Sequence, residues 1–115
     1  MPVHELALTE SIVEIACEEA RKQSARRVTR VRLDVGWLSH AEPDALTFCF
    51  EAVAAGTVVE GALLEIERTP GAGWCLDCGK SVGIAERFGS CPECGKYRVR
   101  MTAGDELKIH ELEIE

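Results

Sequence analysis

The sequence predicts an α+β fold in which two helices pack on a three-stranded mixed sheet, with a zinc-ribbon-like four-cysteine module inserted before the last strand. Three observations support this prediction. Two segments carry apolar residues at helical spacing, three segments alternate apolar and polar residues, and a glycine- and cysteine-rich stretch precedes the last alternating segment. With 115 residues, the chain has room for one small core and an appendage.

The first predicted helix begins at Leu6 or Thr9 and ends at Ser24. Its apolar stripe consists of Leu8, Ile12, Ile15, Ala16 and Ala20. Glutamates lie mostly off that stripe, and basic residues occupy the last turn, where they suit the helix dipole. The pattern is typical of an amphipathic helix that covers a core with one face.

The first strand is predicted within the segment "RRVTRVRLDVG". Val31, Leu33 and Val35 alternate there with charged residues, so the apolar set faces the core. Asp34 and the alternating arginines are expected on the solvated face.

The second helix is predicted within "SHAEPDALTFCFEAVAAG". Pro43 suits the first helical position, Gly56 ends the helix, and Leu46, Phe50 and Val53 form the buried stripe. A second strand follows in "GALLEIERTP", with Leu64 and Ile66 facing inward.

The last strand, "DELKIHELEIE", changes phase along its length. Leu107 and Ile109 occupy odd positions, whereas Leu112 and Ile114 occupy even positions. Because side chains alternate along a strand, a bulge near His110–Glu111 would keep all four residues on the core face.

The change in composition after the second strand predicts two domains. Residues 1–70 and 104–115 would form one domain, and residues 71–103 a separate metal-binding module. Gly71, Gly73 and Gly104 bound this module and are interpreted as flexible glycines. Trp74, Phe88 and Tyr97 are expected to form its small apolar cap.

Four cysteines predict a metal site. Cys75-x2-Cys78 and Cys91-x2-Cys94 are two knuckles of the kind that together hold a tetrahedral Zn(II) ion. A glycine follows each knuckle, where a positive φ turns backbone amides back toward the sulfurs. Because all four positions are filled by thiolates, the zinc is expected to be structural.

The remaining cysteines and the charge of the chain limit the other functions. Cys17 and Cys49 lie on helical segments and are interpreted as small apolar residues.

Neither a nucleophilic triad nor a phosphate-binding glycine loop is present, so we do not expect an enzyme. The net charge of −7 disfavours nucleic acid and anionic membranes as partners. Without a signal-peptide pattern, the chain is expected in the cytoplasm.

The order of the motifs resembles the HypA/HybF family of hydrogenase nickel-incorporation proteins over essentially the whole chain. The resemblance rests on "HEL" at the start of a helix, a strand ending in "VG", "FCFE", the paired CxxC knuckles, and the closing "GDELKIHELEIE". It implies a metallochaperone that delivers Ni(II) to the large subunit of nickel–iron hydrogenase together with the nickel-binding GTPase HypB. The family's nickel ligands map onto His4 and Glu5, with Glu42 as a further acidic candidate, and its zinc ligands map onto the four cysteines.

The chain departs from the family pattern at its start, because Pro2 and Val3 separate the initiator methionine from His4. An imidazole and its own backbone amide chelate one Ni(II) ion well. If Met1 is removed, the new terminus Pro-Val-His would suit square-planar nickel. If Met1 stays, Pro2 has no N–H to ionise, and another donor must complete the site.

Two alternative functions remain open from the residues alone. One is a zinc-ribbon adaptor that binds protein or nucleic acid without nickel transfer. The other is an electron-transfer iron centre, because "CPECG" also resembles a rubredoxin loop. The short span between the knuckles and the attached two-helix domain argue against iron. His40 and His110 are interpreted as surface or strand histidines.

Overall fold

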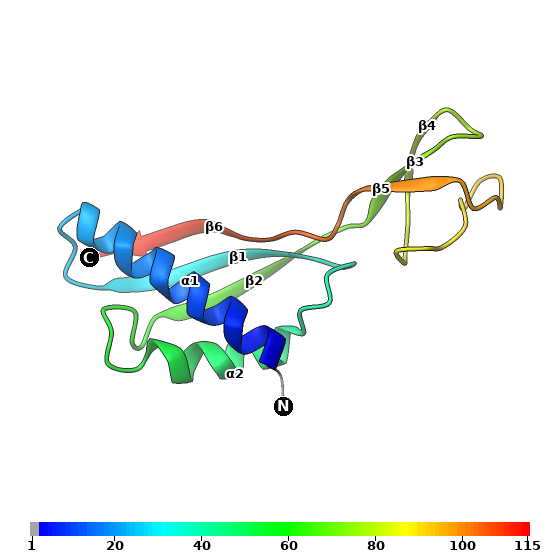
Figure 1. Ribbon diagram of the computed structural model, residues 1–115. Helices are drawn as coiled ribbons and strands as arrows, with labels where there is room; N and C mark the ends of the chain where they lie inside the picture. The colour runs from blue at the N-terminus through cyan, green and yellow to red at the C-terminus, as the bar shows by residue number, and fades with distance from the viewer. Residues whose placement is uncertain (1–2) are drawn as a thin grey trace. The chain divides into compact units, whose positions relative to one another are not determined.

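The computed structural model describes residues 3–115 of the chain and confirms the predicted fold class. The possible removal of Met1 concerns residues outside this range. The elements in chain order are α1 (Val3–Lys22), β1 (Val28–Gly36), α2 (Pro43–Ala54), β2 (Leu63–Thr69), β3 (Ala72–Cys75), β4 (Lys80–Gly83), β5 (Val99–Ala103) and β6 (Leu107–Ile114). Two three-stranded sheets form, with strand orders β2-β1-β6 and β4-β3-β5 (Figure 1). None of the helices described within residues 3–115 has the length and apolar character to span a membrane.

The chain divides into two compact units. The first comprises Met1–Leu33, Ala41–Ile66 and Lys108–Glu115, and the second comprises Asp34–His40 and Glu67–Leu107. The division falls inside β1, β2 and β6, so the second unit includes the ends of the long strands as well as the cysteine module. Whether nickel and zinc belong to separate domains stays a prediction.

The core of the first unit lies between the two helices and the long sheet. Helices α1 and α2 contact each other, and α1 crosses one face of the sheet (Figure 1). The fully buried residues of this core include Ala16, Val28, Val31, Leu33, Leu46, Phe50 and Val59. The inward alternation predicted for β1 is confirmed. Asp34 is only 7% exposed, so its assignment to the solvated face was wrong.

Helix α1 begins earlier than predicted, and Ile12, Ala16 and Ala20 of the predicted stripe are buried. Its start at Val3 places the His-Glu pair inside the first helical turn. Ile15 is 53% exposed, whereas Thr9 is fully buried and donates its hydroxyl to the carbonyl of Glu5 at 2.9 Å. The apolar pattern did not predict the burial of Thr9. A threonine is buried at little cost in free energy when its hydroxyl donates a hydrogen bond to a carbonyl of the same helix.

The C-terminus of α1 is closed by a left-handed residue. Ser24 has φ of 53°, its N–H donates to the carbonyl of Arg21, and the N–H of Ala25 donates to the carbonyl of Ala20. These bonds satisfy carbonyls that the last turn leaves without helical partners.

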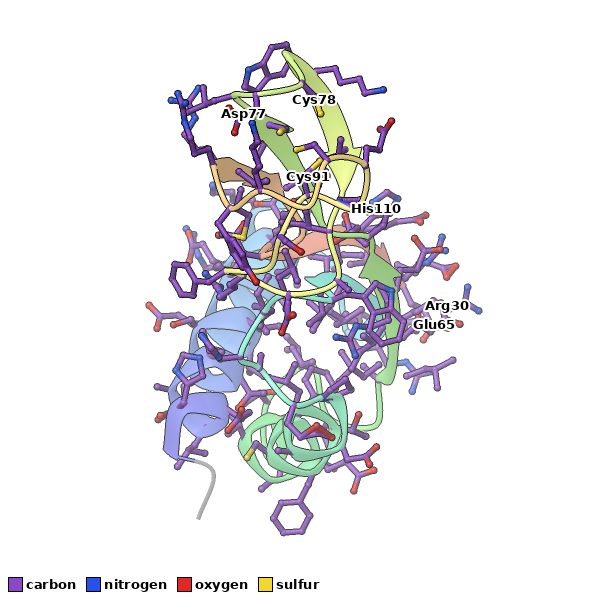
Figure 2. The ribbon with its side chains drawn as sticks, turned by 90° about the vertical axis from the view of Figure 1, so that its right-hand side faces the viewer. Arg30, Glu65, Asp77, Cys78, Cys91 and His110 are labelled. Carbon is purple, nitrogen blue, oxygen red and sulfur yellow. The ribbon has the colours of Figure 1, made fainter. Side chains whose placement is uncertain are left out.

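The outer face of the long sheet is charged. Arg30 of β1 lies 3.7 Å from Glu65 of β2 and 3.1 Å from Glu113 of β6, and Figure 2 shows Arg30 and Glu65 projecting to the same side. Arg32 pairs with Glu65 and Glu111. Ion pairs therefore link all three strands on the face opposite the helices.

Exposure along β6 changes phase where the sequence predicts it. Leu107 and Ile109 are half-buried, His110 and Glu111 are both exposed, and Leu112 is half-buried again. Ile114, expected on the core face, is 41% exposed. The predicted slip thus holds for three of the four apolar residues.

Three glycines meet at the base of the second unit. A Cβ on Gly36 would lie 1.9 Å from the carbonyl oxygen of Gly104, and a Cβ on Gly104 would lie 2.5 Å from the Cα of Gly71. Gly104 also has a φ of 106°. Gly71 and Gly104 are therefore explained by close backbone packing, which corrects their interpretation as merely flexible boundaries.

Candidate metal sites

Each CxxC knuckle is shaped by the same backbone turn. The N–H of Gly79 donates to the carbonyl of Cys75 at 2.8 Å, and the N–H of Gly95 donates to the carbonyl of Cys91 at 2.8 Å. Both glycines have positive φ, 67° and 76°. Because other residues rarely adopt this conformation, a glycine after the second cysteine is the local cause of each turn.

The turns direct backbone N–H groups at the sulfurs. The N–H of Cys78 donates to the Sγ of Cys75 at 3.4 Å, and the N–H of Glu93 donates to the Sγ of Cys91 at 3.4 Å. Such bonds favour the thiolate form that metal binding requires. The backbone N–H groups of Cys94 and Glu93 lower the pKa of Cys91 to about 7, while hydrogen bonds with the thiols of Cys94 and Cys75 raise the pKa of Cys78 to about 12.

The four sulfurs converge at distances that fit a single tetrahedral ion. All four lie within 4.8 Å of one another, with 3.7 Å between Cys75 and Cys94 and 3.9 Å between Cys78 and Cys91. Zinc–sulfur bonds of about 2.3 Å require sulfur separations of about 3.8 Å in a tetrahedron. Figure 2 labels Cys78 and Cys91, one from each knuckle. The four sulfurs therefore fit one tetrahedral metal ion, and Zn(II) stays the predicted occupant.

Strands β3, β4 and β5 hold the first knuckle in place. β3 pairs antiparallel with both neighbours, and Cys75 lies opposite Lys80 in β4 and Val99 in β5. The Nζ of Lys80 lies 2.7 Å from the Oε1 of Glu93, so an ion pair joins the two knuckles. Sequence reasoning missed these three short strands and this ion pair, because no long alternating pattern marks them.

The small core around the sulfurs differs from the predicted cap. Val82 is buried beside Cys75 and Cys91, and the partly buried residues packed against them are Cys78, Ile84 and Val99. Phe88 is 92% exposed and Tyr97 is 75% exposed, and Trp74 also lies outside this cluster. The cap prediction was wrong because aromatic residue type alone does not reveal which side chains pack.

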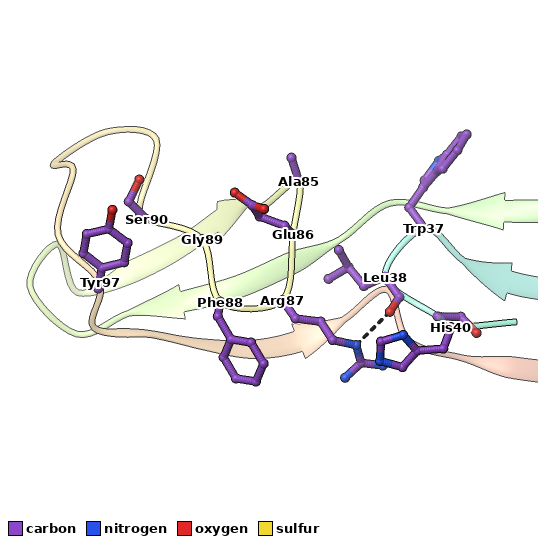
Figure 3. A pocket seen from close by; sticks show the side chains of 11 residues that line it. Trp37, Leu38, His40, Ala85, Glu86, Arg87, Phe88, Gly89, Ser90 and Tyr97 are labelled. Carbon is purple, nitrogen blue, oxygen red and sulfur yellow. Dashed lines mark hydrogen bonds between the residues drawn. The ribbon is translucent and has the colours of Figure 1, made fainter.

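Phe88 and Tyr97 instead line an open groove in the second unit (Figure 3). The Nε of Arg87 donates to the carbonyl oxygen of Leu38 at 2.9 Å, which ties the segment 85–90 to the turn after β1. His40 is exposed and also lines this groove. His40 and His110 are both surface residues, as expected.

The first turn of α1 treats the two members of the His-Glu pair differently. His4 is exposed, whereas Glu5 is 7% exposed. The Oε2 of Glu5 accepts a hydrogen bond from the backbone N–H of Glu42 at 3.1 Å. This bond lowers the pKa of Glu5, which stays ionised.

Glu42 is the N-cap of α2. Its Oε1 accepts a hydrogen bond from the N–H of Asp44 at 3.1 Å, and Pro43 occupies the first position of the helix as predicted. The Glu5–Glu42 contact brings together two of the three residues to which the resemblance assigned nickel. Nothing in the local sequence signals this contact, since the two residues are 37 positions apart.

The nickel candidates do not form a ready-made ligand cluster in the described range. Across residues 3–115, the cysteine set is the one group of three or more His, Cys, Asp or Glu side chains whose ligand atoms converge. Cys17 is half-buried and Cys49 is buried, and both lie outside that set.

Comparison with known proteins gives a consistent result over the whole chain. Residues 3–114 match the family described as "Hydrogenase/urease nickel incorporation, metallochaperone, hypA". The chain is 62% identical to the hydrogenase maturation factor HypA of Rhizobium leguminosarum bv. viciae, over 97% of this chain and 99% of the relative. It is 51% identical to HypA of Methylocella silvestris, over 98% of this chain and 100% of the relative.

Two solved structures share the fold. The solution structure of the Ni metallochaperone HypA from Helicobacter pylori aligns with a TM-score of 0.71 and 26% identity, over 96% of each chain. A second solution structure of a HypA protein aligns with a TM-score of 0.74 and 26% identity, over 100% of this chain and 98% of that one.

Proposed function

This chain belongs to the HypA family of nickel metallochaperones, and we propose that it takes up Ni(II) at the start of α1 while Zn(II) occupies its four-cysteine cluster. Its function is nickel incorporation during the maturation of nickel–iron hydrogenase, and it is not an enzyme. The family match over residues 3–114 carries this conclusion, and the alternatives of a plain adaptor and an iron centre are set aside.

His4 is the proposed anchor of the nickel ion. Its side chain is exposed, and it lies in a helical turn whose N–H groups have no partner one turn earlier. An imidazole together with its own backbone nitrogen forms a chelate that suits Ni(II), which prefers nitrogen and oxygen donors in tetragonal arrangements. A site at the end of a helix is open to solvent, and an open site favours release of the ion to an acceptor.

Glu5 contributes through its backbone nitrogen rather than its carboxylate. Its carboxylate is nearly buried and already accepts the N–H of Glu42. Coordination by that carboxylate would break this bond and leave the N–H of Glu42 without its acceptor, at a cost in free energy. Glu42 is the better oxygen donor, because its carboxylate is exposed and its Oε2 is not engaged by the helix cap.

The zinc ion serves as a structural ion in this proposal. Four thiolates satisfy its coordination, so it supplies stability to a unit whose apolar core is small. Because none of the six cysteines is in a disulfide, and four of them are needed as thiolates for the metal, we place the protein in the reducing cytoplasm. Its proposed partners are the GTPase HypB and the precursor of the hydrogenase large subunit.

The nickel site is tested by calorimetric titration of Ni(II) into zinc-loaded protein. We expect a specific binding event that is largely lost in His4→Gln, because the imidazole anchors the chelate. His40→Gln and His110→Gln are matched controls, since both histidines are exposed and lie elsewhere in the chain. Equal nickel binding by His4→Gln and the natural protein would overturn the proposed site, and zinc content measured in parallel should not change.

A further inference from the structure

The outer edge of β6 is open. The strand order β2-β1-β6 puts β1 in the middle, and no strand of residues 3–115 pairs with the other side of β6. Glu115 exchanges backbone hydrogen bonds with Arg27, its N–H donating at 3.0 Å and its carbonyl accepting at 3.4 Å. Because backbone groups alternate in direction along a strand, those of Leu112 and Ile114 point away from β1 and toward the open edge.

Two hollows that share Glu19 lie on the helix side, one at this edge and one on the surface of α1. One, of about 230 Å³, lies between the last turns of α1 and the end of β6, with Leu112 and Ile114 in its wall. The other, of about 290 Å³, surrounds Ile15 on α1, and Glu19 lines both. Ile15 is 53% exposed and Ile114 is 41% exposed, so the helix and the strand edge each present an apolar side chain to solvent.

The rim of these hollows is acidic. Glu14, Glu18 and Glu19 line them together with Lys22, whose Nζ lies 3.8 Å from the Oε2 of Glu19. Arg21 pairs with Glu18 along the exposed helix surface, and such pairs contribute little to stability. A partner with positive charge would therefore meet carboxylates on the helix side of the edge.

The other face of the edge carries two exposed carboxylates that form ion pairs within the sheet. Glu111 and Glu113 project from β6 toward the charged face, where they contact arginines of β1. A strand added beside β6 would lie about 5 Å from these glutamates and about 10 Å from β1. Basic side chains on that strand would thus become direct cross-strand neighbours of the glutamates.

We propose that the outer edge of β6 docks an extended segment of a partner protein in which apolar residues alternate with lysine or arginine. The backbone of the segment pairs with Leu112 and Ile114. Its apolar face covers Leu112, Ile114 and Ile15, and its basic face meets Glu111 and Glu113. This mode is strand addition, in which main-chain bonds supply affinity and alternate side chains supply specificity.

A second copy of the chain fits this edge poorly. Two β6 strands brought together would place the carboxylates of residues 111, 113 and 115 in one small area, and the chain carries a net charge of −7. Like charges in opposed strands are destabilising. The inference concerns only the first unit and holds whether or not the proposed nickel site is correct.

The test uses the full zinc-loaded chain without nickel, followed by NMR of backbone amides. The probe is a ten-residue acetylated and amidated peptide that alternates valine with lysine. We expect shift changes in β6 and in the second half of α1, with slowed hydrogen exchange at the N–H groups of Leu112 and Ile114. A peptide with glutamate in place of lysine should bind at least about tenfold more weakly.

Matched variants locate the surface. Ile114→Lys should weaken peptide binding by about tenfold or more, because it removes an apolar contact and adds a repelling charge. Leu63→Lys is the control, since Leu63 is also exposed but lies on β2, the opposite edge strand. Both residues are exposed, so both variants should fold with unchanged zinc content.

Three results would overturn the proposal. The first is equal binding of a peptide whose backbone nitrogens are methylated at alternate positions, because that would indicate charge attraction without strand pairing. The second is perturbation centred on β2. The third is a dimer of the free chain in sedimentation that Ile114→Lys abolishes, since the edge would then be occupied by a second copy.

Discussion

The two candidate metal sites are built in opposite ways. In the cysteine site all four ligands fall within 20 residues, and each knuckle closes on itself through a glycine turn. At the proposed nickel site His4 is exposed, and Glu42 at the start of α2 donates its N–H to the carboxylate of Glu5 on α1. Local turns therefore shape the closed cage. A site that depends on a helix end and one long-range hydrogen bond is left open, which suits an ion that must be given up.

The largest expected effect comes from removing one thiolate of the cage. Cys75→Ser should reduce the zinc content to near zero and abolish slow amide exchange in β3, β4 and β5. Zinc supplies about 10 kcal/mol or more in small four-ligand sites, and the apolar cluster around Cys75 is small. Zinc analysis and hydrogen exchange measure the effect.

Cys17→Ser is the matched control, because Cys17 is half-buried but lies outside the sulfur cluster. Retention of zinc and of protected amides in Cys75→Ser would contradict the view that the metal organises this unit.

A smaller effect is expected from the glycine packing at the base of the second unit. Gly36→Ala places a Cβ 1.9 Å from the carbonyl oxygen of Gly104, so the backbone must shift. We expect a loss of about 3 kcal/mol in the free energy of unfolding, measured with urea on zinc-loaded protein. Gly83→Ala is the control, because the nearest atom to its Cβ lies at 4.0 Å, and its effect should stay within about 0.5 kcal/mol. Equal free energies of unfolding for the two variants would contradict a contribution of this glycine packing to stability.

The smallest effect distinguishes the two roles considered for Glu5. Glu5→Gln keeps an oxygen that accepts the N–H of Glu42, whereas Glu5→Ala does not. If Glu5 positions Glu42 and coordinates through its backbone, nickel affinity should be nearly unchanged in Glu5→Gln and several-fold weaker in Glu5→Ala. Calorimetry compares the two, and an equal loss in both variants would favour a carboxylate ligand.

The pH dependence of stability gives an independent readout of the same contact. The N–H of Glu42 lowers the pKa of Glu5, so its contribution to stability is fully present above the ordinary glutamate pKa and is lost as the pH falls through the lowered value. Glu5→Gln does not titrate. The stability difference between the natural protein and this variant should therefore narrow at acid pH, as followed by thermal unfolding.

Much of the fold was predictable because its determinants are local. Pro43 marked the start of α2, the alternation Val31, Leu33, Val35 marked the buried face of β1, and the two CxxC spacings marked the sulfur cluster. In each case neighbouring residues supply the geometry, so a short window of sequence contains the information.

The errors arose where a distant partner decides burial. Glu5 and Asp34 are polar yet buried, and Ile15 is apolar yet exposed. Residue type predicts burial only on average, because a carboxylate with a hydrogen-bond donor is stable inside and an isoleucine away from the contact face gains nothing. The functional assignment of the nickel residues rested on family resemblance, since the sequence holds no local pattern that unites His4 with Glu42.

The meeting of Gly36, Gly71 and Gly104 limits how this protein could be re-engineered. Three segments of the chain contact one another there through glycine backbone atoms. Making a neighbouring side chain smaller would therefore not accommodate a larger residue at these positions. An exchange of the cysteine module for another metal-binding insert should keep all three residues and splice only beyond them. A graft that replaces any of these glycines would require the backbones of all three segments to repack.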